Sequence, residues 1–452
     1  PLGFDGKGNV TVPPGLAKSY RAFYEAGAHL LNLPEHLGGM GAPPSVGWAA
    51  FEFVVGANAP LAFYLFGNFT ARTIDRYGTD SQKSRYIENV LGRAWSGSMV
   101  LTEPDAGSDV GAGRTKATHV EGDVWHIEGT KRFITNGDFD VPENIVHLVL
   151  ARPEGAKEGA KGISLFIVPK FWVNEDGSLG ERNGAFVTKV EDKMGIKGSA
   201  TCEMVFGDGT PAKGLLMGGV HDGIKQMFHV IEQARMGVGM KSMSTLSTAY
   251  LNALEYAKDR TQGPDLAQAA DKAAPRVKIL RHPDVRRMLM SQKAHAEGMR
   301  ALCLYAAWVQ DQVEIAGGHG NKEADALDKL NDMLLPLVKG YCSDAAYRAR
   351  APLPGARPTP RARAQTAELR GLGLHQGSPD RAVRARSQDR LALRGHDAHP
   401  GARSLLPQDR QRRWPNAHAP ARGGREGREW QRRRRLDRRR ALGAGQGARR
   451  GA

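Results

Sequence analysis

Two segments in the middle of the chain constrain its fold most, because each reads as a strand that ends in a polar turn. In residues 98–109 an apolar run leads into residues 104–107, whose proline and glycine favour a β-turn. In residues 125–137 a second strand pattern ends in Thr-Asn-Gly. Such corners expose backbone N–H groups and hydroxyls, here the hydroxyls of Thr102 and Ser108. These groups are suited to bind a polar ring edge or an acyl-carrier chain. A single turn of this kind is more often an ordinary loop, so the inference depends on the pair.

Three motifs together resemble the acyl-CoA dehydrogenase family of flavoproteins. They are Thr-Glu-Pro-Asp-Ala-Gly-Ser-Asp at residues 102–109, Gly-Thr-Lys-Arg-Phe-Ile-Thr-Asn-Gly at residues 129–137 and Asp-Lys-Met-Gly-Ile-Lys-Gly-Ser at residues 192–199. The resemblance extends from about residue 15 to residue 347 and then stops. Residues 262–264 and 335–339 look most similar to the larger bacterial branch that acts on fatty-acyl or methylthiopropionyl thioesters.

This resemblance implies an FAD-dependent oxidoreductase of fatty acid β-oxidation and lipid metabolism, with an acyl-CoA as substrate. In the family reaction a carboxylate removes the α-proton of the thioester, and a hydride passes from the β-carbon to flavin N5. Hydrogen-bond donors must stabilise the developing enolate oxygen, and water must be excluded while the base acts.

The resemblance also implies which residues would hold the flavin ring. Met99, Leu101 and Thr102 would bond the pyrimidine edge of the isoalloxazine, the first two through their backbone. Phe133 would lie against the ring, and the Thr135 hydroxyl would lie near N5. For Phe133 a place in the apolar core is an equally good reading before its Thr-Asn-Gly context is considered.

Four further residues are implied at the substrate and at the cofactor phosphates. Ser108 would bond the pantetheine or phosphate part of the substrate or cofactor, and Arg235 would lie near the catalytic base. Arg260 would bind the cofactor phosphates, with Gln262 beside it. Plainer readings stay open, namely a helix-surface ion pair for Arg235 and a solvated helix-end charge for Arg260.

Helical and strand-like patterns alternate in blocks that predict an α+β fold. Residues 1–95 are expected to form an N-terminal helical domain, which is incomplete because the family's first helices are missing. Residues 96–212 are expected to form the flavin-binding antiparallel β-domain, a small sandwich or barrel. Residues 213–350 predict an incomplete C-terminal helical bundle, because amphipathic helices this long must bury a stripe against neighbours.

Residues 351–452 have a different composition from the rest of the chain. They hold 25 Arg, no Lys and eight acidic residues, so the net charge of +16 resides in this tail and the remainder is close to neutral. The tail lacks Ile, Met, Phe, Tyr and Cys and shows no apolar periodicity, which predicts a disordered Arg-rich segment.

An out-of-frame translation explains this tail better than a basic arm that binds nucleic acid. Plausible codons read one base later spell segments that look like the family's last helices, including the Tyr-Glu-Gly-Thr segment that carries the catalytic base. The codon for that glutamate would straddle Arg394 and Gly395. We therefore assign no catalytic residue and expect this chain to lack dehydrogenase activity even if it holds FAD.

The resemblance implies an electron-transfer flavoprotein as electron acceptor and a homodimer or dimer of dimers, because subunits of the family share the cofactor phosphates. Two alternatives remain: an acyl-CoA oxidase-like enzyme, and a non-catalytic flavoprotein that binds DNA through the tail. The three cysteines and the histidines show no metal-ligand spacing, so we expect no metal site. The cysteine usage and the lack of a long apolar run favour a cytoplasmic protein without a membrane segment.

Overall fold

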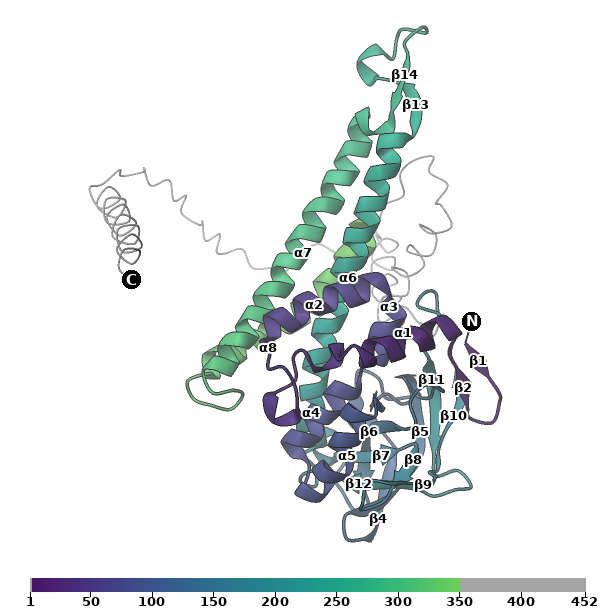
Figure 1. The fold of residues 1–452 in the computed structure, drawn as a ribbon, viewed down its shortest axis with the longest axis vertical. Helices are drawn as coiled ribbons and strands as arrows, with labels where there is room; N and C mark the ends of the chain where they lie inside the picture. The colour runs from purple at the N-terminus through teal and green to yellow at the C-terminus, as the bar shows by residue number, and fades with distance from the viewer. Residues whose placement is uncertain (1, 350–452) are drawn as a thin grey trace, which may run out of the picture. The chain divides into compact units, whose positions relative to one another are not determined.

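The computed structural model describes residues 2–349. The predictions made for residues 351–452, namely the disordered tail, the shifted reading frame and the lost catalytic base, lie outside the described residues. Within residues 2–349, helices at both ends of the sequence enclose a block of strands, which is the expected α+β arrangement (Figure 1).

The N-terminal part is mainly helical. Helix α5 shows how sequence fixes a boundary: the Thr79 hydroxyl accepts from the Gln82 N–H, and the Gln82 side chain accepts from the Thr79 N–H, each at 3.2 Å. The residues between α1 and α2 form two short 3-10 turns. The elements are β1 (Gly3–Phe4), β2 (Val10–Thr11), α1 (Pro14–Glu25), η1 (Ala28–Leu30), η2 (Glu35–Leu37), α2 (Pro44–Ala57), α3 (Ala59–Tyr64), α4 (Gly67–Tyr77) and α5 (Asp80–Gly92).

The middle part is a sheet whose order is β10-β11-β5-β12-β7-β6-β3, with β4 paired to both β5 and β6. These pairings close β5, β12, β7, β6 and β4 into a ring, in keeping with the predicted sandwich or barrel. The elements are β3 (Ser96–Val100), η3 (Val110–Ala112), β4 (Lys116–Glu121), β5 (Val124–Thr135), β6 (Ile145–Pro153), η4 (Ala160–Gly162), β7 (Ser164–Pro169), β8 (Phe171–Val173), β9 (Leu179–Arg182), β10 (Ala185–Val190), β11 (Thr201–Phe206) and β12 (Ala212–Leu216).

Two strand pairings differ from the antiparallel expectation. Strand β3 runs parallel to β6, and β4 pairs with β6 in parallel over two positions. The chain reaches β6 only after the β4–β5 hairpin, so β6 re-enters the sheet in the same direction as β3. The other pairings of this sheet are antiparallel.

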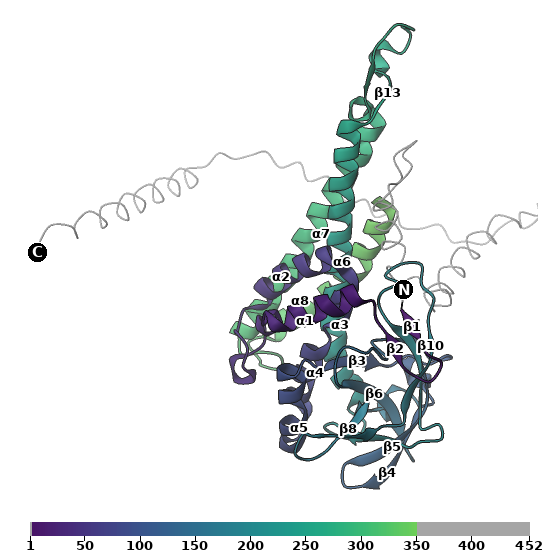
Figure 2. The ribbon, with the colours of Figure 1, turned by 45° about the vertical axis from the view of Figure 1, so that its right-hand side comes forward.

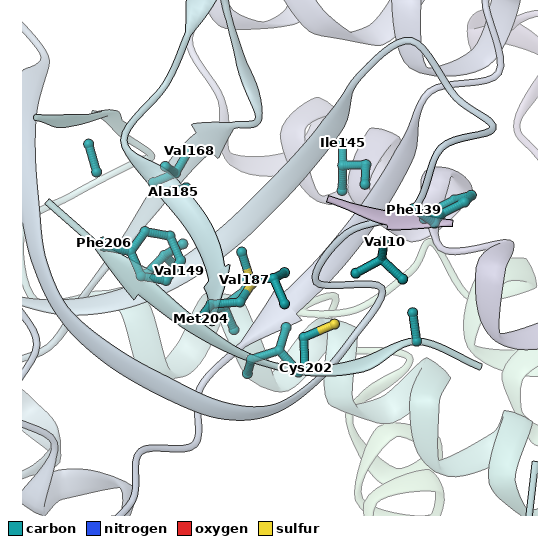
Figure 3. Close-up of a cluster of buried hydrophobic side chains, with 14 of the residues drawn as sticks. Val10, Phe139, Ile145, Val149, Val168, Ala185, Val187, Cys202, Met204 and Phe206 are labelled. Carbon is teal, nitrogen blue, oxygen red and sulfur yellow. The ribbon is translucent and has the colours of Figure 1, made fainter. Parts of the chain in front are cut away.

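A continuous apolar cluster fills the β-domain beneath both corners (Figure 3). Phe206, Met204 and Cys202 point into it from alternate positions of β11, as the period of a half-buried strand requires. Tyr64 from α3 and Phe139 from the loop after β5 join the same cluster, with ring centroids 4.5 Å apart. The core therefore ties the helices before the sheet to the corner that follows β5.

The C-terminal part consists of three long helices. Helices α6 and α7 run side by side away from the β-domain, and a small two-stranded sheet lies at their far end (Figures 1 and 2). No helix within residues 2–349 combines the length and the apolar content that crossing a membrane requires. The elements are α6 (Gly223–Asp259), β13 (Thr261–Pro264), η5 (Leu266–Gln268), β14 (Arg276–Lys278), η6 (Ile279–Arg281), α7 (Pro283–Ile315) and α8 (Asp325–Ala349).

Candidate functional site

The two corners predicted from the sequence lie against each other. The N–H of Arg132 on β5 donates to the carbonyl of Thr102 at 2.8 Å, which joins the end of the second strand to the turn after β3. The turn itself spans Glu103 to Ala106, whose backbones exchange two hydrogen bonds. It begins one residue earlier than predicted, because proline is best accommodated at the second position of such a turn.

A buried ion pair fixes the first corner to the second. Glu103 and Lys131 are 7% and 1% exposed, and the Lys131 Nζ donates to Glu103 Oε1 at 2.9 Å. The same ammonium donates to the carbonyls of Leu101 and Leu150, so each of its three protons has an acceptor. A buried charge is tolerated only when it is paired and hydrogen-bonded, and this pair meets both conditions.

The Glu103 carboxylate also accepts from two backbone N–H groups, those of Arg114 at 2.6 Å and Thr115 at 3.1 Å. Burial raises the pKa of Glu103, but the Lys131 ammonium and the hydrogen bonds at Arg114 and Thr115 outweigh it and hold that pKa below its usual value. Glu103 is therefore ionised at neutral pH and serves as the anchor of the corner.

A β-bulge presents Phe133 to the outside of the sheet. Two residues of β5, Arg132 and Phe133, lie opposite the single residue Glu203 of β11, and Phe133 has a left-handed backbone with φ +62°. Its ring is half-buried, whereas the next residue, Ile134, is buried in the core. The core reading of Phe133 therefore does not describe its position.

Ion pairs and a ring contact hold the bulge in place. The Arg132 guanidinium lies 5.0 Å from the Phe133 ring centroid, and its Nε donates to Glu191 at 3.0 Å. Glu203 lies 3.6 Å from the same Nε. A left-handed conformation at a bulky residue costs free energy, so its support by several partners is typical of a functional position.

The Thr-Asn-Gly corner is packed tightly behind this bulge. Asn136 is fully buried, has φ +59° and donates through its side chain to the carbonyls of Phe63 and Gly97. A Cβ at Gly137 would lie 2.6 Å from the Cβ of Cys202, so only glycine fits there. These contacts fix the backbone that carries Thr135.

Two hydroxyls flank the bulge and remain available. Thr102 and Thr135 are half-buried, and within residues 2–349 neither side chain has a hydrogen-bond partner. Met99 and Leu101 are also half-buried and pack against the second apolar cluster, while Ser108 is exposed. The hydroxyls and the strand-end backbone N–H groups are hydrogen-bond donors that suit the polar edge of a flavin. The outward-facing ring of Phe133 suits the face of a flavin.

The remaining predicted residues lie apart from the corners. Arg260 and Gln262 are exposed just beyond the end of α6, which has 37 residues and is therefore about 55 Å long. Strand β13, which follows α6 directly, lies at the end of the long helices that points away from β5 (Figure 1). Arg235 is half-buried within α6, with its guanidinium 5.7 Å from the Phe228 ring centroid. Within residues 2–349 no carboxylate pairs with Arg235, which disfavours the ion-pair reading.

The sequence reasoning gave no role to Glu103, Lys131 and Asn136, although all three lie in the quoted motifs. A charged or amide residue that sits among strand residues was the available signal, because such side chains are buried only when paired. The pairing partners could not be read from spacing, since they come from elements far apart in the sequence.

Comparisons with known proteins agree with this fold. Three family models match in order: the N-terminal domain of acyl-CoA dehydrogenase at residues 8–93, its middle domain at 98–208 and its C-terminal domain at 221–347. The chain belongs to the acyl-CoA dehydrogenase family.

Two curated relatives and one solved structure illustrate the similarity. A broad-specificity linear acyl-CoA dehydrogenase, FadE5, of Mycobacterium tuberculosis is 56% identical over 342 residues, covering 75% of this chain and 56% of the relative. The 3-methylmercaptopropionyl-CoA dehydrogenase of Ruegeria pomeroyi is 40% identical over 343 residues, with the same two coverages. The chain thus spans little more than half of either relative. The butyryl-CoA dehydrogenase structure from Megasphaera elsdenii is 22% identical, with a TM-score of 0.60 over 83% of this chain and 90% of that one, and supports the fold alone.

Proposed function

We propose that residues 2–349 form the flavin-binding frame of an FAD-dependent acyl-CoA dehydrogenase. The observation that carries this proposal is the pair of unpartnered hydroxyls, Thr102 and Thr135, on either side of the left-handed Phe133. The names of the two curated relatives, both acyl-CoA dehydrogenases by their printed descriptions, support the same reaction and substrate class.

Each corner residue would have a defined task. Thr102 and the backbone of Met99 and Leu101 would donate to the polar edge of the isoalloxazine, Phe133 would pack on its face and Thr135 would bond near N5. Ser108 would bond the polar chain of the substrate or cofactor. When bound, FAD supplies the acceptor for the hydride that leaves the substrate.

The chain as written is proposed to hold FAD without turning over. The α-proton of a thioester is weakly acidic, so its removal requires a positioned carboxylate in a site shielded from water. The segment that should carry this base lies in residues 351–452, where Arg394 and Gly395 take its place. A shifted reading frame in that region would account for both the composition and the missing base.

The rest of the assignment also forms part of this proposal. Residues 1–95, 96–212 and 213–350 would be the three domains, and an electron-transfer flavoprotein would accept the electrons. Since Arg260 and Gln262 lie at the far end of α6, they would reach the cofactor phosphates of a second subunit in a homodimer or dimer of dimers. Arg235 would act nearer the substrate.

A cytoplasmic location fits three cysteines that are all buried and not joined by disulfides. Neither the oxidase-like nor the DNA-binding alternative gains support from the relatives.

An FAD titration tests the proposal. Thr102→Val and Thr135→Val each remove one hydroxyl with little change of shape, and each is expected to weaken FAD binding by about 5-fold, since one hydrogen bond contributes roughly 1 kcal/mol. Thr118→Val on the exposed side of β4 is the matched control and should bind as the parent does. A folded chain that does not quench flavin fluorescence, or variants that bind like the control, would refute the site.

A further inference from the structure

A cluster of imidazole and carboxylate groups lies where α6 meets the loop between α7 and α8. His229 and Glu232 come from α6, one turn apart on the same face, and His319 comes from the loop. One ligand atom of each lies within 4.8 Å of the other two. Two imidazoles and one carboxylate are a donor set that suits Zn²⁺ and similar first-row cations. None of these residues belongs to the proposed flavin site.

A carboxylate behind the cluster orients one of the imidazoles. Nδ1 of His319 lies 2.5 Å from Oδ1 of Asp328 in the first turn of α8. The contact fixes the ring and leaves Nε2 as its remaining ligand atom. An imidazole held by a carboxylate in this way is the usual arrangement behind a metal-binding histidine, because the carboxylate raises the basicity of the ligand.

Acidic side chains crowd the same place. The carboxylates of Asp328 and Asp332 lie near the half-buried Glu232. A cation bound between the ligands would offset this local excess of negative charge.

Arg76 competes for the same imidazole. Its Nη1 lies 2.7 Å from Nε2 of His229, and the opposite nitrogen of that ring lies 3.8 Å from Glu232. A neutral imidazole has a single lone pair, so His229 cannot accept from Arg76 and bind a cation at once. Arg76 is exposed at the end of α4, so its side chain can swing into solvent. Cation binding should therefore be opposed by Arg76 and strengthened by its removal.

We propose that His229, Glu232 and His319 bind a divalent transition-metal cation of the Zn²⁺ type, with Asp328 as the positioning residue. The cation would connect α6 to the α7–α8 loop. That loop contains three glycines with φ between +85° and +92° at 317, 318 and 320, so it has few side chains of its own to hold it. This proposal replaces the expectation of no metal site, which considered only spacing along the sequence.

Competition with a chromophoric chelator, on the full chain freed of metal, measures Zn²⁺ affinity and stoichiometry. We expect one Zn²⁺ per chain and a higher melting temperature on its addition. Glu232→Gln and His319→Ala should each weaken binding by at least about 10-fold, and Asp328→Asn by about 10-fold or more with all three ligands still present. His119→Ala, an exposed histidine on β4, is the matched control. Far-UV circular dichroism checks that every variant is folded.

The Arg76→Ala variant distinguishes a metal site from a histidine pair that has only a structural role. It should tighten Zn²⁺ binding, and Co²⁺ should give a visible absorption band in the parent and in this variant that is absent in His319→Ala. The proposal is overturned if the parent binds no Zn²⁺ stoichiometrically, or if Glu232→Gln and His319→Ala bind like the control. Unchanged or weaker binding by Arg76→Ala would likewise contradict a site at His229.

Discussion

At the scale of single residues, the ion pair of Glu103 and Lys131 decides whether the two corners stay joined. Both side chains are buried. Besides each other, they engage four backbone groups: Glu103 accepts from two N–H groups and Lys131 donates to two carbonyls. Burial of the ammonium works against the pair, but each of its protons has an acceptor. Removal of one partner leaves an uncompensated buried charge, which is far costlier than the pair is stabilising.

Lys131→Met should therefore lower the free energy of unfolding by about 3–5 kcal/mol, because it leaves the Glu103 carboxylate buried without its cation. Chemical denaturation monitored by circular dichroism measures the change. Lys116→Met, an exposed position on β4, is the control and should change stability by less than about 0.5 kcal/mol. A Lys131→Met chain as stable as this control would mean that the ion pair does not hold the corner.

The decrease in the free energy of unfolding at acidic pH should also depend on Glu103. Its folded-state pKa lies below the usual value, so its stabilisation is complete above the unfolded-state pKa, roughly 4.3. That stabilisation is lost as the pH falls through the lower folded-state pKa. Unfolding free energies measured from neutral to acidic pH should fall less steeply in the double variant Glu103→Gln with Lys131→Met. Identical slopes in parent and double variant would contradict this assignment.

At the scale of elements, the bulge in β5 determines the direction in which the Phe133 ring points. Two residues opposite Glu203 force the strand to bend, and Phe133 takes the left-handed conformation that turns its ring out of the core. Glycine or asparagine would adopt this backbone at lower cost. Under the proposed function, the ring of Phe133 is what justifies this cost.

Phe133→Asn should keep or slightly raise the melting temperature while weakening FAD binding by about 2- to 10-fold, since an aromatic stack contributes roughly 0.5–1.5 kcal/mol. Phe133→Trp should preserve binding, because it keeps an aromatic face. Thermal melts and flavin fluorescence titrations separate the two effects. Equal FAD affinity in the asparagine and tryptophan variants would show that the ring does not contact the flavin.

Several elements were predictable because one local pattern dominates them. The β-branched and apolar runs at 145–150 and 202–206 became β6 and β11, and helical spacing at 224–258 became α6. Strands β8 and β9 have only three and four residues, too few to show a period of their own, so no pattern predicted them. The bulge at Phe133 depends on its partner strand, and the cluster of His229 with His319 depends on packing between elements. Neither can be read from one segment.

At the scale of the whole molecule, the predicted site residues fall into groups that one chain does not unite. Thr102, Phe133 and Thr135 lie together at the end of the sheet, whereas Arg260 and Gln262 lie beyond the end of α6. The sequence motifs identified each group by resemblance, but their separation follows from the length of α6. The second subunit of the proposed dimer would bring the groups together.

The chain as written should show no dehydrogenation of a short acyl-CoA with a dye acceptor, even when loaded with FAD. A version in which the tail is encoded one base later should turn over, because in our proposal that frame would supply the carboxylate base. The dye-coupled rate of the two purified chains is the comparison. Turnover by the chain as written, above that of a sample without FAD, would contradict the loss of the base.

Hydrogen–deuterium exchange with and without FAD tests the central claim most directly, because it locates the bound flavin on the backbone. The account predicts new protection confined mainly to residues 99–108 and 131–136, the two corners joined by Arg132 and Thr102. Saturable FAD binding that leaves both segments unprotected, or protects only other parts of the chain, would contradict it.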